Sequence, residues 1–116
     1  MSSLNTFGAI LSYAAEMEAQ LCDWYGGMGE SAKAKAADKR RKKLERVRRE
    51  NVVEITLEPI AGLDAADYAL DLADVSREGQ AAVADIAARF YRDVAPKINV
   101  RAAQRALERC GREHMR

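Results

Sequence analysis

The chain has 116 residues, of which 48% are hydrophobic and 32% charged, and its formal net charge is +1. This length predicts one domain with a single modest core. No apolar stretch approaches the roughly 20 residues of a membrane span, and no basic region precedes an apolar core at the N-terminus. Cys22 and Cys110 are too few for a disulfide scaffold and lack metal-ligand spacing. We therefore expect a cytoplasmic protein without a membrane segment.

The near-neutral total charge conceals blocks of opposite sign. Residues 1–30 carry four acids and no base, residues 31–50 ten bases and three acids, residues 51–75 six acids and no base, and residues 76–116 nine bases and five acids. Such blocks tend to pair with each other, either inside a bundle or between subunits. The basic segment 33–49 is accordingly expected to be a solvated face or a partner for the acidic block. Nucleic-acid binding through this segment is an alternative, disfavoured because no aromatic residues are interleaved with the bases.

The first half of the chain predicts two antiparallel helices. The first helix runs from a cap at Ser3 or Asn5 to about Tyr25, where Gly26-Gly27 ends it. Its apolar residues recur every three or four positions, which indicates one buried stripe made of Phe7, Ile10, Leu11, Ala14, Met17, Leu21 and Trp24. After a short link, the second helix begins near Ser31 and continues to about Leu57. Its early part is poor in apolar residues, which suggests that this part projects or meets another subunit.

The second half predicts a break and two further helices. Pro59 and Gly62 end the second helix, and Asp64 caps a short helical piece from Ala65 to about Asp74. The third long helix is capped by Ser76 or, alternatively, already starts at Asp64. The buried face of the third helix is expected to hold Val83, Ile86, Phe90 and Val94. Pro96 then interrupts the chain, and a fourth helix runs from about Val100 to the end.

An eight-residue phrase occurs twice, and it indicates a duplicated helical hairpin. Residues 44–51 (LERVRREN) and 107–114 (LERCGREH) are identical at five of eight positions, at an offset of 63 residues. Two aromatic pairs, Trp24-Tyr25 and Phe90-Tyr91, are offset by 66. The hairpins would span about 4–57 and 76–116, joined by a crossover of about 58–75, all within a single domain, 1–116. This short–long–short linkage is the layout of ferritin-like four-helix bundles, and a simple up-down-up-down bundle is the alternative.

In this arrangement the chain resembles the ferritin-like superfamily, particularly its small rubrerythrin-like members. The resemblance implies a di-iron site in which the first and third helices each supply a Glu seven residues before a tyrosine, and the second and fourth each supply Glu-x-x-His. The first helix matches, because Glu18 lies seven residues before Tyr25. The remaining family positions hold Ala84 on the third helix, Arg48 and Asn51 on the second, and Gly111 and His114 on the fourth. Of the six family ligands, only Glu18 and His114 are therefore left.

The degenerate ligand set predicts that metal chemistry has been lost. Two ligands are too few for a di-iron centre, and Arg48 would place a fixed cation where a metal belongs. We expect a non-catalytic structural or interaction module that is a homo-oligomer, namely a homodimer. We expect no cofactor and no catalytic or metal-binding residues. The alternative is a residual iron or manganese oxidoreductase of the rubrerythrin-like type that uses Glu16, Glu18, Asp85 and His114.

Two residues of the degenerate site carry specific hypotheses. Arg48 shares a helical stripe with Leu44, Asn51 and Ile55, and we expect it to replace the metal charge by pairing with Glu18 in the interior. The other interpretation is that Arg48 points to solvent. His114, near a helix C-terminus, is expected to be a surface or capping residue, with a residual metal ligand as the alternative.

Overall fold

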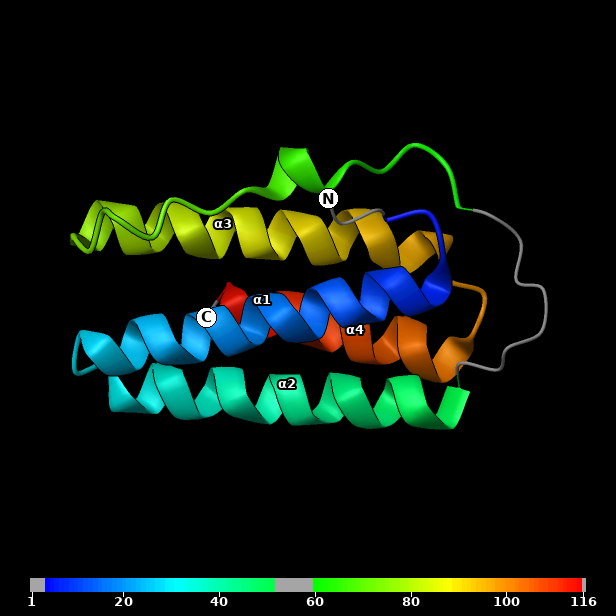
Figure 1. The fold of residues 1–116 in the computed structure, drawn as a ribbon, viewed down its shortest axis with the longest axis horizontal. Helices are drawn as coiled ribbons and strands as arrows, with labels where there is room; N and C mark the ends of the chain where they lie inside the picture. The colour runs from blue at the N-terminus through cyan, green and yellow to red at the C-terminus, as the bar shows by residue number, and fades with distance from the viewer. Residues whose placement is uncertain (1–3, 52–59, 116) are drawn as a thin grey trace.

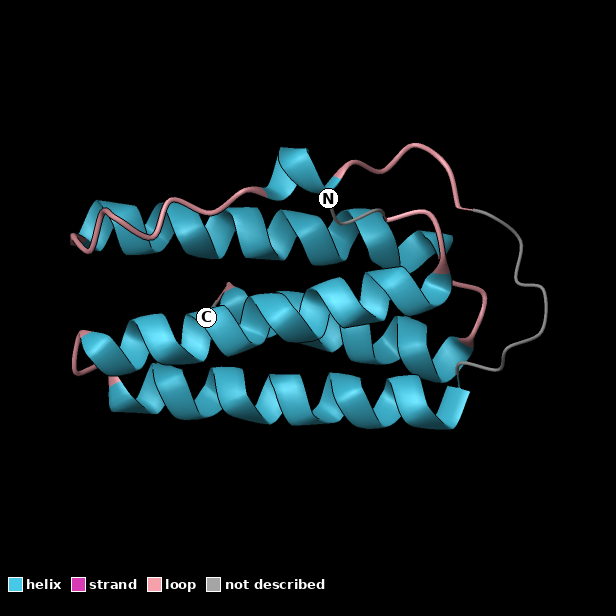
Figure 2. Cartoon of the chain, viewed as in Figure 1, coloured by secondary structure: helices cyan, strands magenta, loops and turns pink. Residues whose placement is uncertain are grey.

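The computed structural model describes residues 4–51 and 60–115, which form four α-helices and two short 3₁₀ turns (Figure 1). The helices are α1 (Phe7–Gly27), α2 (Ser31–Asn51), α3 (Arg77–Val94) and α4 (Arg101–His114), and the turns are η1 (Ala65–Tyr68) and η2 (Ala95–Lys97). No strand occurs in these two ranges, as Figure 2 shows. The predicted all-α class is confirmed, and no helix in the described part is long and apolar enough to cross a membrane.

The first hairpin begins at a cap different from the predicted one. Thr6 caps α1, because its hydroxyl oxygen accepts a hydrogen bond from the Ala9 N–H at 3.0 Å. The expectation of Ser3 or Asn5 as cap was wrong, and the carbonyl of Asn5 instead accepts the N–H of Ile60 at 2.8 Å. At the other end of α1, Gly29 adopts a positive φ of 79°, which closes the turn so that α2 starts at Ser31 as predicted. The predicted end of this helix at Leu57 lies outside the described residues.

Ser76 begins the third helix, which decides between the two predicted starts. Its side chain accepts a hydrogen bond from the Gly79 N–H at 3.1 Å. Asp64 caps only the single turn η1, so the short helical piece is shorter than the predicted span to Asp74. Gly79 is required here, because a Cβ at this position would lie 2.2 Å from the carbonyl oxygen of Asp74. Glycine therefore lets the preceding segment fold tightly onto the start of α3.

Contacts at one end of the bundle fix the directions of the helices. The ammonium of Lys33, early in α2, donates to the Gln80 side chain, early in α3, at 3.1 Å. The indole N–H of Trp24, late in α1, donates to the carbonyl of Leu72 at 2.8 Å. The starts of α2 and α3 therefore share one end, and the two helices run in the same direction, each antiparallel to its hairpin partner (Figure 1). Segment 60–76 runs back beside α3, on the edge of the bundle opposite α2 (Figure 1).

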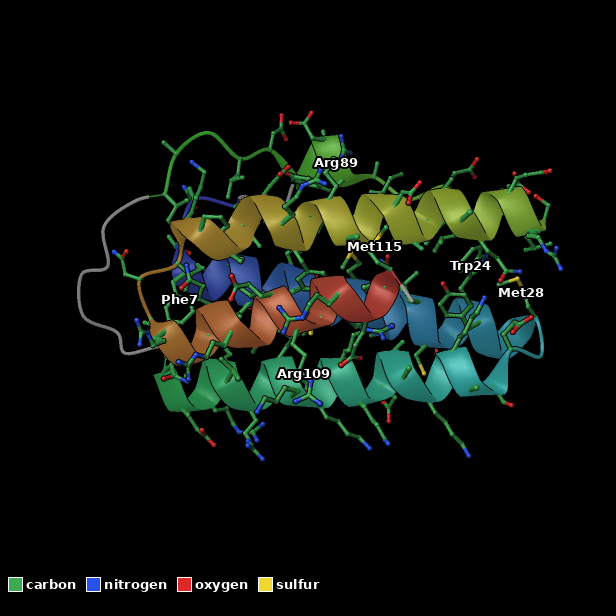
Figure 3. The ribbon with its side chains drawn as sticks, turned by 180° about the vertical axis from the view of Figure 1, so that it is seen from behind. Phe7, Trp24, Met28, Arg89, Arg109 and Met115 are labelled. Carbon is green, nitrogen blue, oxygen red and sulfur yellow. The ribbon has the colours of Figure 1, made fainter. Side chains whose placement is uncertain are left out.

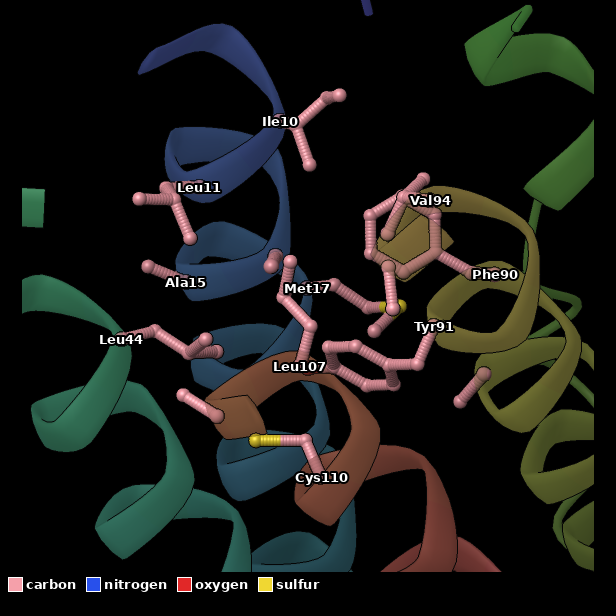
Figure 4. Packing of buried hydrophobic residues seen from close by; sticks show 14 of the residues in the cluster. Ile10, Leu11, Ala15, Met17, Leu44, Phe90, Tyr91, Val94, Leu107 and Cys110 are labelled. Atoms are coloured by element: carbon pink, nitrogen blue, oxygen red, sulfur yellow. The ribbon is translucent and has the colours of Figure 1, made fainter. Parts of the chain in front are cut away.

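Aromatic side chains gather around Phe90 of α3 in the core, where Tyr91 lies beside it (Figure 4). Phe90 is fully buried and its ring centre lies 5.1 Å from that of Tyr13 and 5.2 Å from those of Tyr68 and Tyr91. Most of the predicted stripe of α1 is buried, with Trp24 only partly so. The same stripe also buries one charged residue, Glu18, which leads to the candidate site.

Candidate functional site

A fully buried carboxylate lies at the centre of the bundle, surrounded by hydrogen-bond donors. Glu18 has an exposed fraction of 0%. Its Oε1 lies 2.9 Å from Nε of Arg40, and its Oε2 accepts hydrogen bonds from the Tyr91 hydroxyl at 2.5 Å and from Nε2 of His114 at 2.8 Å. Each of the four helices thus supplies one residue of what we call the Glu18 cluster: Glu18, Arg40, Tyr91 and His114.

The register of the first hairpin selects Arg40 as the partner of Glu18. In an antiparallel hairpin, two residues that face each other across the helices have residue numbers with the same sum at every level. The contact between Glu18 and Arg40 fixes that sum for this hairpin. By the same sum Arg48 is level with Ile10, eight residues and about 12 Å further along the helix. The predicted pairing of Arg48 with Glu18 was wrong, since Arg48 is exposed. Glu18 does have a buried cationic partner, but Arg40 provides it.

The remaining residue of the degenerate second-helix motif also lies away from the cluster. Asn51 donates from its side chain to the carbonyl of Val47 within its own helix, at 2.9 Å. The last turn of α2 therefore contributes neither of the ligands that the family motif would place there.

The fourth helix, in contrast, carries its histidine into the core. His114 has an exposed fraction of 8%, and its ring stacks on that of Tyr91 with the ring centres 5.8 Å apart. The expectation of a surface or capping histidine was wrong, because the last turn of α4 packs against Glu18 rather than facing solvent. Gly111 permits this packing, since a Cβ there would lie only 3.0 Å from Cβ of Tyr91. A glutamate at 111, where the family motif would place one, would require Tyr91 to shift by a few tenths of an ångström.

The charge states of the cluster follow from burial and from these contacts. Burial by itself would raise the pKa of Glu18, but the hydrogen bond and charge of His114, the charge of Arg40 and the Tyr91 hydroxyl together lower it below its usual value. Burial would lower the pKa of Arg40, yet the carboxylate of Glu18 outweighs it and raises that pKa. Burial and the nearby Glu18 charge raise the pKa of Tyr91 well above its ordinary value, so its hydroxyl keeps the proton that it donates. The carboxylate can only accept, so Nε2 of His114 carries a hydrogen toward it.

An ion-pair chain connects the cluster to the surface. Nη1 of Arg40 donates to Oε1 of Glu113 at 3.2 Å, and the other oxygen of Glu113 lies 3.5 Å from Nε of Arg109. The pair of Glu113 with Arg109 lies within α4, at a spacing of four residues. Glu113 also gives Arg40 a second carboxylate, which holds the guanidinium in place from the side opposite Glu18.

The residues present do not fit a di-iron centre. Glu18 and His114 are brought together, but they bond directly to each other, and Arg40 occupies the second carboxylate oxygen. Within residues 4–51 and 60–115 no group of three or more His, Cys, Asp or Glu is placed to hold a metal ion. Glu16 and Asp85, which the alternative site would use, are both exposed. Ala84 and Gly111 offer no donor atoms, so the donor set is too small for two irons.

Two cavities flank the Arg40–Glu113 pair. A cavity of about 550 Å³ opens between α2, α3 and the end of α4, and its lining includes Ala84, Asp85 and His114. A second cavity of about 420 Å³ lies between α2 and α4. The third-helix position of the family site, Ala84, therefore faces an open space beside the cluster rather than a ligand-filled centre.

Arg40 and Tyr91 are the cluster residues that the sequence analysis did not assign to the site. Arg40 had a detectable signal, because Ala37, Arg40, Leu44 and Val47 follow one another at spacings of three, four and three, and all four are buried. A cation inside an apolar stripe indicates a buried partner. Tyr91 is the tyrosine that marks Ala84 as the third-helix motif position and was expected in the core or at its edge with its hydroxyl at a partner, but its local sequence does not show that this partner is a carboxylate from α1.

Comparison of the chain with protein-family models, with curated proteins and with solved structures finds no match. The resemblance to ferritin-like proteins thus remains a prediction based on helix order and motif remnants.

Proposed function

We propose that the protein is a metal-independent bundle of ferritin-like layout, which acts as an oligomeric structural or interaction module and not as an enzyme. The observation that carries the proposal is the buried ion pair between Arg40 and Glu18, at 2.9 Å. A carboxylate buried in a bundle core requires a compensating cation, which a di-iron protein provides with metal. Here the guanidinium of Arg40 provides it from within the chain.

The cluster has no group prepared for catalysis. Both oxygens of Glu18 are engaged, and no buried side-chain nitrogen or oxygen in the described part of the chain lacks a hydrogen-bond partner. The nearby thiol of Cys110 is also unreactive, because burial raises its pKa to about 12, so it is a thiol and not a thiolate at neutral pH. A satisfied network of this kind rigidifies a core and specifies its packing.

The arrangement of the helices supports the ferritin-like part of the proposal. Two antiparallel hairpins lie side by side, α2 and α3 run in the same direction, and a long connection separates them. Ferritin-like bundles share this connectivity. The remaining Glu18 and His114 occupy one level of the core, as the family motif requires.

Metal analysis tests the proposal directly. Protein from cells grown with added iron and manganese should contain negligible metal, while its mass in solution exceeds that of one chain. About two metals per chain, as in the di-metal sites of this fold, would overturn the proposal and favour the rubrerythrin-like oxidoreductase. Glu18→Gln is the matched control, because metal bound at the cluster would be lost from this variant and metal bound at the surface would not.

A further inference from the structure

A row of lysines on α2 has no acidic partner within the described part of the chain. Lys35, Lys39 and Lys43 line the cavity of about 420 Å³ between α2 and α4. The acids of α2 serve other bases, since Asp38 pairs with Arg41 and Lys42, Glu45 with Arg41, and Glu50 with Arg46. The acids of α2 therefore neutralise bases that lie outside the cavity, and the three lysines that line the cavity keep an unneutralised positive charge.

The opposite wall and the floor of this cavity suit an extended acidic segment. Arg109 adds a fourth base from α4, at the junction of the two helices (Figure 3). The remaining lining consists of four small or apolar side chains, from Ala32, Ala36, Ala106 and Cys110, and of Arg40 and Glu113. Glu113 is the one acid of the lining, and it is paired with Arg40 and Arg109, which leaves the three lysines without an acidic partner. We call this surface the basic groove, defined by Lys35, Lys39, Lys43 and Arg109.

A complementary acidic surface lies elsewhere on the same chain. Five exposed acids fall between residues 64 and 78, and we call them the acidic strip: Asp64, Asp67, Asp71, Asp74 and Glu78. None of them forms a side-chain ion pair within residues 4–51 and 60–115. The strip also exposes the apolar side chain of Val75, at 54%.

The acidic strip is held in place by contacts with α1 and α3. The Tyr68 hydroxyl donates to Asp93 at 2.8 Å, and the guanidinium of Arg89 lies over the Tyr68 ring and bonds to the carbonyl of Asp67. The Trp24 indole holds the carbonyl of Leu72. An ordered strip presents its charges without a large ordering cost on binding.

The two charged surfaces face away from each other. The basic groove lies between α2 and α4, whereas the acidic strip is attached to α1 and α3. Figures 1 and 3 show α2 and segment 60–76 on opposite edges of the bundle. The two surfaces therefore cannot neutralise each other within one chain.

We propose that the basic groove of one chain binds the acidic strip of a second copy. This inference deepens the proposed function, on which it rests, by naming the partner and the two surfaces. The lysine row spans eight residues, or about 12 Å, and seven residues of extended chain between Asp67 and Asp74 reach at most about 23 Å. Several acids of one copy therefore reach the bases of the other, while Val75 lies among them as an apolar contact.

The basic groove and the acidic strip lie on opposite sides of the chain, so the contact joins two different surfaces of the two copies and is heterologous. Each copy that uses its groove keeps its strip available, and the reverse also holds, so that copies add head to tail. The attraction depends on exposed charges, and salt weakens it because the Debye length shrinks from about 30 Å at 0.01 M to about 3 Å at 1 M.

A second copy fits the groove better than a nucleic acid does. No aromatic side chain lines the groove, although stacking on aromatic residues is the usual support for single strands. The chain as a whole carries a net charge of only +1, whereas an isolated nucleic-acid-binding domain is commonly strongly basic. The acidic strip supplies a partner whose charge and length are present in the same molecule.

Sedimentation velocity at increasing protein concentration tests the interface. In low salt the average mass of the wild-type chain should rise with concentration, and about 0.5 M salt should return it to the monomer. The double variant K39E/K43E, which reverses the groove, and D67K/D71K, which reverses the strip, should each weaken association at least about tenfold. R48E/R49E is the matched control, because it changes the net charge of α2 by the same amount outside the groove and should assemble like the wild type.

Mixing experiments add a result that a general charge effect would not give. K39E/K43E mixed with D67K/D71K should associate again, because each reversed surface meets its complement. All these substitutions are at exposed positions, and circular dichroism checks that the helices are retained.

Three results would overturn the interface. They are a wild-type chain that stays monomeric in low salt, equal loss of association in R48E/R49E, and tight binding of a 20-nucleotide single strand through Lys39 and Lys43 by a chain that stays monomeric. The metal analysis of the Glu18 cluster does not depend on any of these results. A monomeric wild-type chain would also overturn the oligomeric part of the proposed function, whereas equal loss of association in R48E/R49E would overturn the interface alone.

Discussion

The two helical hairpins contribute to the core cluster in different ways. Hairpin α1–α2 supplies the two full charges, Glu18 and Arg40, whereas hairpin α3–α4 supplies two ring-bearing donors, Tyr91 and His114. The hairpins share the phrase at 44–51 and 107–114, yet only the second copy of the phrase ends in the cluster. Repeated sequence therefore does not place its copies at equivalent levels of the bundle.

The different links between the helices account for this difference. α1 and α2 are joined by a turn of three residues, Met28 to Glu30, while α3 and α4 are joined through η2 and the extended residues up to Val100. The first link sets Arg40 level with Glu18 and carries Arg48 two turns past it. The second link and the shorter α4 end the phrase at the level of Glu18. Register, and not residue identity alone, selects the residues of the cluster.

Removing Arg40 should have the largest effect on stability and tests the role of the first hairpin. Arg40→Met leaves Glu18 as a buried carboxylate without its cation, and should lower the free energy of unfolding by about 3–5 kcal/mol. Arg48→Met, at the position expected from the repeat, should change it by no more than roughly 0.5 kcal/mol because Arg48 is exposed. Urea denaturation followed by circular dichroism measures both.

A double variant separates the lost charge pair from lost packing. Glu18→Leu combined with Arg40→Met removes both charges, and should recover most of the stability lost in Arg40→Met, since apolar replacements of buried ion pairs are often neutral. Equal destabilisation in the single and double variants would show that volume, and not an unpaired carboxylate, dominates.

A smaller change in the free energy of unfolding is expected when the last residue of either repeated phrase, Asn51 or His114, is replaced. His114→Phe keeps a ring against Tyr91 but removes the hydrogen bond to a charged group, which should cost about 1.5–3 kcal/mol. Asn51→Ala removes only a bond within its own helix, and should remain within about 0.5 kcal/mol. Similar losses in the two variants, measured by urea denaturation, would contradict the asymmetry between the hairpins.

Acid stability provides the mildest test, because acid neutralises the Glu18 carboxylate without replacing any side chain. The pKa of Glu18 is lowered in the folded state, so its stabilising contribution is complete above its unfolded pKa, about 4.3, and is lost as the pH falls through the lower folded value. The free energy of unfolding should therefore fall more steeply below about pH 4.3 in the wild type than in Glu18→Gln. Equal slopes in urea titrations from neutral pH to about pH 3 would mean that no depressed pKa exists at Glu18.

Much of the fold was predictable because it depends on local sequence. The starts of α2 and α3 follow from Gly29 and Ser76, which set backbone conformation and satisfy helix ends within a few residues. The buried stripe of α1 follows from helical periodicity, which needs only the sequence of one element. The cap at Thr6 is equally local, but Ser3, Asn5 and Thr6 are all capping residue types within four positions, so the sequence does not single out one of them.

The candidate site was only half predictable, for the same reason. Glu18 and His114 were found as remnants of a motif, but Arg40 was displaced by a mistaken register and Tyr91 gave no local signal for its role. A buried carboxylate selects partners by distance in space, and the distances depend on how two hairpins dock.

The amino-acid sequence is sufficient to predict the all-α class, the starts of α2 and α3 and the alternating blocks of charge. Tertiary structure alone decided that Arg40 and not Arg48 neutralises Glu18, that His114 is buried, and that the acidic strip and the basic groove lie on opposite faces. Helix formation depends on neighbours within about four residues, so the sequence suffices for it. Pairing of charges across the bundle depends on turn geometry and helix register, which shift side chains by about 1.5 Å for each residue of slip.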